Sequence, residues 1–483
     1  MGWAASDPGR WGLFVALSFV VAAVTYLRFR SGGITRTEVL VWAVASRLTL
    51  IWLPPVLSDD GYRYVWDGML QADGINPFLY TPEDPALAAY RSEAIYGKLN
   101  STSYHTVYPP ASQAVFSIGG AFYDEGWKVS YFVIKGIIAL AEVVGLWMLL
   151  SLFRTRHVLL YAWNPLVLIA AAGQPHGEAL AVALLAGVLW MARHGSGRGA
   201  SVLLAFAGLV KLIPFLLFPF LWRRFGWRGV WPGLLVGIVF WIPYAHPDVP
   251  LNLLSSLQLY VALFEFNAGP YYLLKGVVKL LTGFDASWII GPGFGLAFLV
   301  SVGTLYVRAE RMRLSLRSLF VVVLGLFLVL ATTVHPWYLL PVLALTTGAR
   351  RPSWHWLCLS VASIGTYLLY VGGPYWTFVW IGWTGWFLLL VHRHRDVILA
   401  FVLQRRGRAK ARRVMALLPA LDADQVILDL GAAEGYVGAA LAERTGASVV
   451  LADVRPANRT DLPYVTFDGA HLPFSDRHFD VTL

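Results

Sequence analysis

The sequence has little charge and almost no cysteine. Only 14% of its 483 residues are charged, against about a quarter in an ordinary soluble domain, while 57% are hydrophobic and the mean hydropathy is +0.60. The only cysteine is Cys358, which excludes an intrachain disulfide and a cysteine-based metal site. We see no internal repeat, and the carboxylates form no recognisable metal-ligand set, so no metal is expected. A soluble globular class is therefore excluded for most of the chain.

The sequence is instead rich in apolar runs of roughly twenty residues, the length that crosses a bilayer as a helix. They lie at about 11–28, 37–56, 130–153, 157–173, 177–192, 199–222, 229–245, 286–307, 316–334, 336–347, 354–371 and 374–391. The first lacks a strongly basic leader and a small-residue cleavage site, so we expect a span rather than a signal peptide. The predicted fold is an all-α polytopic membrane protein with about 11–13 spans.

The formal net charge of +10 comes mainly from Lys and Arg in short loops between these runs. Such loops face the cytoplasm in membrane proteins, so orientation explains the charge better than nucleic-acid binding does. We expect a multi-pass protein of the inner or plasma membrane. The topology requires 199–222 to form a hairpin around Lys211 and Pro214 that enters and leaves on the same side.

With the basic loops inside, four polar motifs fall on the outer face. They are SDDGYRYVWDG at 58–68, YPP at 108–110, GQPHGE at 173–178 and VHPWY at 334–338. Each has a structural alternative, such as a proline helix start, an interfacial aromatic anchor or a polar group at a helix end. Their common face favours one extracytoplasmic site.

These motifs make the membrane part resemble GT-C-type glycosyltransferases, specifically the bacterial polyprenyl-phosphate-sugar-dependent mannosyltransferase-like families. The matching pieces, spread over about 11–391, are 59–60 with 62–68, 74–78, 108–110, 163–165, 210–214 and 335–338. The resemblance implies a multispan fold whose first large external loop supplies the catalytic carboxylate. It also implies transfer of a hexose, mannose in this family, from a polyprenyl-phosphate donor to an extracytoplasmic glycan or lipid acceptor.

Such a transfer needs a base for the acceptor hydroxyl and cations for the leaving phosphate. The resemblance favours Asp60 as the base, with Asp59 second; Asp59 could instead cap the helix that begins near Gly61. Arg63, Arg47 and Lys211 are candidate phosphate ligands. Arg47 lies inside a predicted span, where its partner could equally be the carboxylate of Glu142.

Further candidates for sugar or phosphate binding lie at the external ends of spans. His176, Glu178 and His335 could bind sugar hydroxyls or the phosphate, or could be satisfied polar groups at helix ends. Trp337 and Tyr338 could stack on a sugar or prenyl group, although interfacial anchoring is a common role for such aromatics.

Beyond residue 395 the composition becomes that of a soluble domain. We expect a membrane domain at 1–395, a basic juxtamembrane linker at 396–420 that contacts anionic lipid headgroups, and a cytoplasmic α/β domain at 421–483. The last contains a strand at 425–430, a glycine-rich turn, a helix from about 437 to 444 and a second strand at 447–451.

This third part resembles the N-terminal half of a class I S-adenosylmethionine-dependent methyltransferase, type 11-like. The resemblance places Gly431 and Gly435 at the methionine part of the cofactor, Asp453 at the ribose, Asp468 near the adenine amine and Asp429 nearby. The alternative is a generic nucleotide-binding α/β domain. The sequence stops near the end of a fourth strand, so we expect an incomplete Rossmann-like fold and doubt that it methylates anything.

Two other function classes compete with this interpretation. A lipid or sugar transporter would place charged residues and broken helices at mid-depth in two related halves. A membrane-anchored methyltransferase would need far fewer spans. The absence of a repeat argues against the first, and the number of spans argues against the second.

Overall fold

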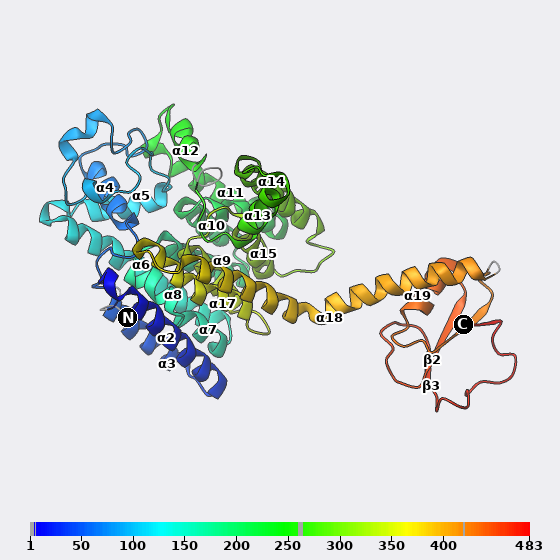
Figure 1. Cartoon of the computed structure of the whole chain (residues 1–483). Coiled ribbons are helices and arrows are strands. Elements are labelled where there is room, and N and C mark those ends of the chain that lie inside the picture. Colours follow the sequence, from blue (N-terminus) through cyan, green and yellow to red (C-terminus); the bar gives the residue numbers. More distant parts are fainter. Residues whose placement is uncertain (1–3, 5, 259–263, 419–420) are drawn as a thin grey trace. The chain divides into compact units, whose positions relative to one another are not determined.

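The structure is a computed structural model that describes residue 4 and residues 6–258, 264–418 and 421–483. The chain divides into two compact units, Met1–Phe387 and Leu388–Leu483 (Figure 1). The first unit is helical, and the second contains a small sheet. The division falls inside the long helix α18, Tyr375–Leu417.

The helices of the first unit largely follow the apolar segments of the sequence. The α-helices are α2 Trp11–Ser31, α3 Arg36–Leu50, α4 Asp60–Ala72, α5 Pro110–Gly120, α6 Trp127–Leu152, α7 Thr155–Ala162, α8 Pro165–Leu168, α9 Gly177–Arg193, α10 Gly197–Val210, α11 Phe218–Val239, α12 Val249–Gln258, α13 Gly269–Thr282, α14 Ser287–Arg308, α15 Leu316–Leu330, α16 Leu340–Thr346 and α17 Trp354–Ile364. Shorter helical turns join them: η1 Pro8–Arg10, η2 Pro85–Tyr90, η3 Tyr96–Lys98, η4 Tyr123–Glu125, η5 Ile169–Gly173, η6 Ile213–Leu217, η7 Ile242–Tyr244, η9 Pro336–Leu339 and η10 Gly365–Val371.

Five helical segments of the described chain are long and apolar enough to cross a membrane, at 8–31, 127–152, 213–244, 287–308 and 354–371, although the third of them is divided by non-helical backbone angles at Gly226. A sixth appears if the bent pair 165–173 and 177–193 is one span. The protein is therefore a helical membrane protein. These candidates are fewer than the 11–13 spans predicted, because several apolar runs form helices of 10–17 residues, such as 197–210 and 316–330.

Proline, glycine and polar residues cause these interruptions. Asn164 caps the short helix α8, whose first residue is Pro165. The chain bends by 107° between η5 and α9, at the GQPH sequence 173–176. Helix α10 ends at Val210, and Lys211 has extended backbone angles. Broken helices leave backbone polar groups that must lie inside the protein or line a cavity.

The hairpin predicted around Lys211 and Pro214 is present. A Cβ atom added to Gly208 would lie 2.6 Å from the Phe215 ring, and one on Gly197 would lie 2.7 Å from Phe225. The segment after Lys211 therefore runs back along α10. Gly226, with φ 64°, reverses the chain again, since Phe215 also approaches Gly237, which a straight helix would place about 33 Å away.

Helix α4 is unusually buried for a helix that starts with a carboxylate. All residues from Gly61 to Leu70 are buried. Its backbone touches that of α5, because a Cβ on Gly120 would lie 2.0 Å from the carbonyl oxygen of Gly68. This contact fixes the position of the first turn of α4, where Asp60 lies.

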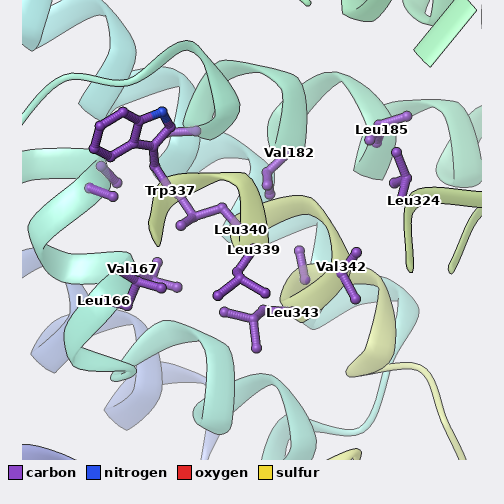
Figure 2. Close-up of a cluster of buried hydrophobic side chains, with 14 of the residues drawn as sticks. Leu166, Val167, Val182, Leu185, Leu324, Trp337, Leu339, Leu340, Val342 and Leu343 are labelled. Carbon is purple, nitrogen blue, oxygen red and sulfur yellow. The ribbon is translucent and has the colours of Figure 1, made fainter. Parts of the chain in front are cut away.

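A hydrophobic core backs the ends of these helices. Figure 2 shows part of this core, to which Leu166 and Val167 of α8, Val182 of α9, Leu340 of α16 and Trp337 of η9 belong. Trp337 is thus held by packed side chains from several elements. By contrast, large apolar side chains are exposed on many helices, as expected for a surface that faces lipid.

The second unit has a four-stranded parallel sheet in the order β3-β2-β1-β4. The strands are β1 Val426–Leu430, β2 Ser448–Asp453, β3 Tyr464–Thr466 and β4 Val481–Thr482, and α19 Tyr436–Thr445 joins β1 to β2. The predicted strand–helix–strand order is therefore correct. The end of α18 packs on α19, where Ala411, Ala440 and Leu441 form a small core.

Candidate functional site

The two adjacent carboxylates have different surroundings at the start of α4. Asp59 is the N-cap residue, but its side chain makes no capping hydrogen bond and instead accepts one of 2.7 Å from Asn100 Nδ2. The capping role considered for Asp59 was therefore wrong. Burial, together with the charge of Asp60, raises the pKa of Asp59 to about 6.

Asp60 points towards several cationic or polar groups. Its Oδ2 lies 3.5 Å from Nδ1 of His176, and its side chain is 25% exposed. Burial alone raises the pKa of Asp60, but the neighbouring His176, with a smaller effect of Lys211, outweighs burial and holds that pKa below its ordinary value. Asp60 is therefore the more acidic member of the pair and stays ionised in the pH range in which Asp59 takes up a proton.

His176 belongs to an aromatic stack built from two distant segments. Its ring lies parallel to the Trp337 indole at a centroid distance of 3.7 Å, and the His335 ring lies parallel to the same indole at 4.5 Å. Trp337 is only 6% exposed. Its faces are occupied by imidazoles, so the structure does not support Trp337 as a platform for a sugar or prenyl group.

Lys211 joins the site from the break after α10. Its Nζ lies 3.1 Å from Oε1 of Glu178 and over the rings of Tyr108 and Tyr338, at 5.3 and 5.6 Å. A Cβ on Gly177 would come within 3.6 Å of the Lys211 Cε. Three of the four predicted external motifs thus meet near Lys211.

Several polar atoms around this point are buried and have no hydrogen-bond partner in the part of the chain that the structure describes. They are Nδ1 and Nε2 of His176, Oε2 of Glu178 and Nδ1 of His335. Burying a polar atom without a partner costs free energy, and native proteins rarely do so without a reason. Such a cluster at the beginning of α9, where backbone N–H groups favour an anion, is expected of a site that binds a polar ligand.

Two of the predicted phosphate ligands are used elsewhere. Arg47 forms a buried ion pair with Glu142, with bonds of 2.6 and 2.8 Å, which is the structural alternative considered above. Arg63 donates to Asp67 Oδ1 at 2.9 Å and to the carbonyl oxygens of Ser101 and Tyr104. Both guanidinium groups bind protein oxygens, so the structure does not support either as a phosphate ligand.

Two side chains near the site were not predicted from the sequence. Asn100, in the loop between α4 and α5, binds Asp59. The buried hydroxyl of Tyr367 in η10 has no hydrogen-bond partner among the described residues and interacts electrostatically with Asp60. An asparagine in a loop and a tyrosine in an apolar run carry no pattern of their own. No sequence signal could have found them.

Two of the three acidic residues predicted to bind a cofactor, Asp429 and Asp453, hold the backbone in and just after the glycine-rich turn of the second unit. Asp429 Oδ2 accepts from Gly438 N at 2.9 Å, and Asp453 Oδ2 accepts from Ala433 N at 2.8 Å. Asp468 caps its own turn by accepting from the backbone N–H groups of Ala470 and His471.

The glycines of that turn leave room for a ligand at one position only. Gly431 has φ 75° and open space where a side chain would be, whereas Gly435 packs against Leu451 and Asn458. Asp453 lies at the carboxyl end of β2, where its two carboxylate oxygens accept from the backbone N–H groups of Ala433 and Arg455. Gly435 shapes the turn rather than facing a ligand. Among the described residues no group of three His, Cys, Asp or Glu side chains could hold a metal ion.

Comparison with known proteins gives two findings. Residues 6–225 match the family model described as alpha-(1->6)-mannopyranosyltransferase, N-terminal domain. The chain is also 36% identical over 90 residues to a demethylmenaquinone methyltransferase of Corynebacterium urealyticum, which covers 18% of this chain and 37% of that protein. The chain thus spans little more than a third of this curated relative. No solved structure matches the chain.

Proposed function

We propose that this chain is a membrane mannosyltransferase of the GT-C type. It moves a hexose, mannose, from a polyprenyl-phosphate donor to an extracytoplasmic glycan or lipid acceptor. The match of residues 6–225 to a mannopyranosyltransferase family supports the sugar. The observation that carries the proposal is the meeting of Asp60, His176 and Lys211, which come from three separate segments at interrupted helix ends.

The chemistry follows from these groups. The acceptor hydroxyl oxygen attacks the anomeric carbon of the donor sugar, the bond from that carbon to the phosphate oxygen breaks, and the phosphate leaves with the electron pair. Asp60 takes the hydroxyl proton, for which it must be ionised beforehand. Lys211 stabilises the charge of the leaving phosphate. Glu178, His335 and Tyr338 line the same region and are proposed to bind the polar parts of donor and acceptor.

An apolar groove supports a lipid-linked donor. It has a volume of about 650 Å³ and includes Ile238, Trp241, Ile242 and Val249 among its lining residues. Trp241 packs in the same cluster as Val210, the residue before Lys211. The groove therefore lies next to the packed cluster that includes the end of α10, and we propose that it takes the prenyl chain of the donor.

The test is transfer of a labelled sugar from polyprenyl phosphate in reconstituted membranes. Asp60→Asn should abolish transfer, because an amide cannot take the proton, whereas Asp59→Asn should keep at least a tenth of the wild-type rate. Full activity of Asp60→Asn would refute the assignment of the base. The broken helices near the site also fit a transporter, so sugar flux across the membrane without transfer would favour that class instead.

For the second unit we infer a methyltransferase-like domain that binds S-adenosylmethionine on the cytoplasmic side. Its strand order and the likeness to a demethylmenaquinone methyltransferase support this. Gly431 and Asp453 would hold the cofactor, which when bound supplies an activated methyl group. Titration calorimetry with S-adenosylmethionine on the full chain should show binding that Asp453→Ala weakens at least tenfold, while the exposed control Asp424→Ala leaves it unchanged. No binding to the wild-type chain would refute this role.

A further inference from the structure

His176 is among the most deeply buried side chains of the site. It is 1% exposed, and neither ring nitrogen has a hydrogen-bond partner among the described residues. A buried imidazole in this state needs a reason. The nearest charged atom is Oδ2 of Asp60, at 3.5 Å from Nδ1, slightly beyond a good hydrogen bond. Such contacts at catalytic sites often tighten only when the substrate is bound.

The chain next to His176 is hydrogen-bonded to the segment that precedes α4 and Asp60. Gln174 Nε2 donates to the carbonyl oxygen of Pro54 at 2.9 Å, and the backbone N–H of His176 donates to the carbonyl oxygen of Ala170 at 3.3 Å. The His176 ring itself is fixed by its stack on Trp337, which the core of Figure 2 supports. Both position and ring plane are thus determined by the protein rather than by a ligand.

We propose that His176 is a positioning residue for Asp60: its Nδ1–H orients the Asp60 carboxylate and favours its ionised form, and Trp337 fixes the plane of the imidazole. This inference rests on the proposed function only for the role of Asp60 as base. It assigns to His176 a task other than binding sugar or phosphate directly, and it gives Trp337 a task in place of stacking on substrate.

Other ionisable groups also act on Asp60. They are Asp59 on the same turn, Lys211 after α10, His335 before η9, and Tyr367 and Tyr370 of η10. Burial lowers the pKa of His335 to about 3, so His335 is neutral at physiological pH and adds no positive charge. Lys211 is paired with Glu178. His176 is therefore the group whose removal should change the ionisation of Asp60 most.

The experiment is the pH profile of kcat/KM for sugar transfer in reconstituted membranes. In His176→Ala the rate should fall about 100-fold, and the acid limb should move to higher pH by about one unit, because Asp60 loses a group that favours its charge. His176→Asn, whose amide can replace the Nδ1 donor, should transfer sugar at least tenfold faster than His176→Ala. Trp337→Ala should move the limb in the same direction as His176→Ala, since it frees the imidazole.

The matched control is His194→Ala. His194 lies at the other end of α9 and contacts Trp190 at a centroid distance of 4.2 Å, so the variant removes a similar pair far along the same helix. It should leave rate and pH profile unchanged. A fall in rate for His176→Ala without movement of the acid limb would overturn the proposal and make His176 a substrate ligand.

A second measurement does not depend on transfer activity. The unfolding equilibria of Asp60→Asn, His176→Ala and the double variant form a cycle, and contact between the two side chains should change the unfolding constant about tenfold beyond additivity. Additive effects would overturn the proposed contact. Coupling in a protein that transfers no sugar would refute the proposed function while leaving the contact intact.

Discussion

The ion pair between Arg47 and Glu142 offers a sharp test of which cations are structural. Both side chains are at most 4% exposed and share bonds of 2.6 and 2.8 Å, and Arg47 also donates to the carbonyl oxygens of Ala43 and Ala162. Removing one partner leaves an uncompensated buried charge, which typically costs about 3–5 kcal/mol. Arg47→Met and Glu142→Leu should therefore each destabilise the protein by about that amount.

The double variant Arg47→Met/Glu142→Leu separates the two roles considered for Arg47. It removes both charges and leaves apolar side chains of similar volume, so its free energy of unfolding should lie within about 1–2 kcal/mol of wild type. The assay is denaturant titration in mixed micelles, followed by transfer activity at 25 °C. A folded double variant with wild-type transfer supports a structural pair. A stable double variant that has lost transfer would refute this reasoning and restore Arg47 as a phosphate ligand.

Three further predictions follow from single positions. Lys211→Met should lower kcat for sugar transfer about 100-fold, because a fixed cation near a developing phosphate charge contributes about 3 kcal/mol, and Lys211→Arg should keep most of the rate. Because the pKa of Asp59 is raised to about 6, the folded chain binds more protons than the unfolded chain between about pH 4 and pH 6. The free energy of unfolding should therefore fall as pH rises through this range. Unfolding of Asp59→Asn, measured over the same range, should lack this slope. Gly120→Ala should destabilise by more than about 2 kcal/mol because of the contact with Gly68, whereas Gly136→Ala, which has open space, should not.

The membrane class and the convergence of motifs could be predicted because they depend on composition and on local sequence. The apolar runs predicted the positions of most helices. The uneven distribution of basic loops predicted the hairpin at Lys211, and the contacts of Phe215 confirm that the chain turns back there. The number of spans could not be predicted in this way. Hydropathy averages over the GQPH sequence and over Gly226, where a few backbone angles bend or reverse the chain.

The sequence also could not predict which side chains from distant segments form ion pairs with one another. Arg47 and Glu142 lie 95 residues apart, and the choice between a phosphate and a carboxylate as the partner of Arg47 depends on how α3 and α6 pack. Arg63 carried a stronger local signal, since Asp67 follows four residues later on the same helix, the spacing at which side chains meet. That spacing favours an internal ion pair, and the prediction of Arg63 as a phosphate ligand did not take it into account.

The interruptions that reduced the number of spans are also the features that form the site. In an intact span, every backbone N–H group would be used in the hydrogen bonds of the helix. His176 or Lys211 would then face lipid, which costs a large free energy. Breaking the helix at 173–176 and at Lys211 lets these side chains lie in the protein interior, next to the first turn of α4. Asp60 then meets charged groups from segments more than a hundred residues away. The polar residues that weaken the hydropathy signal are therefore the better guide to function, and substitutions there should affect transfer before they affect stability.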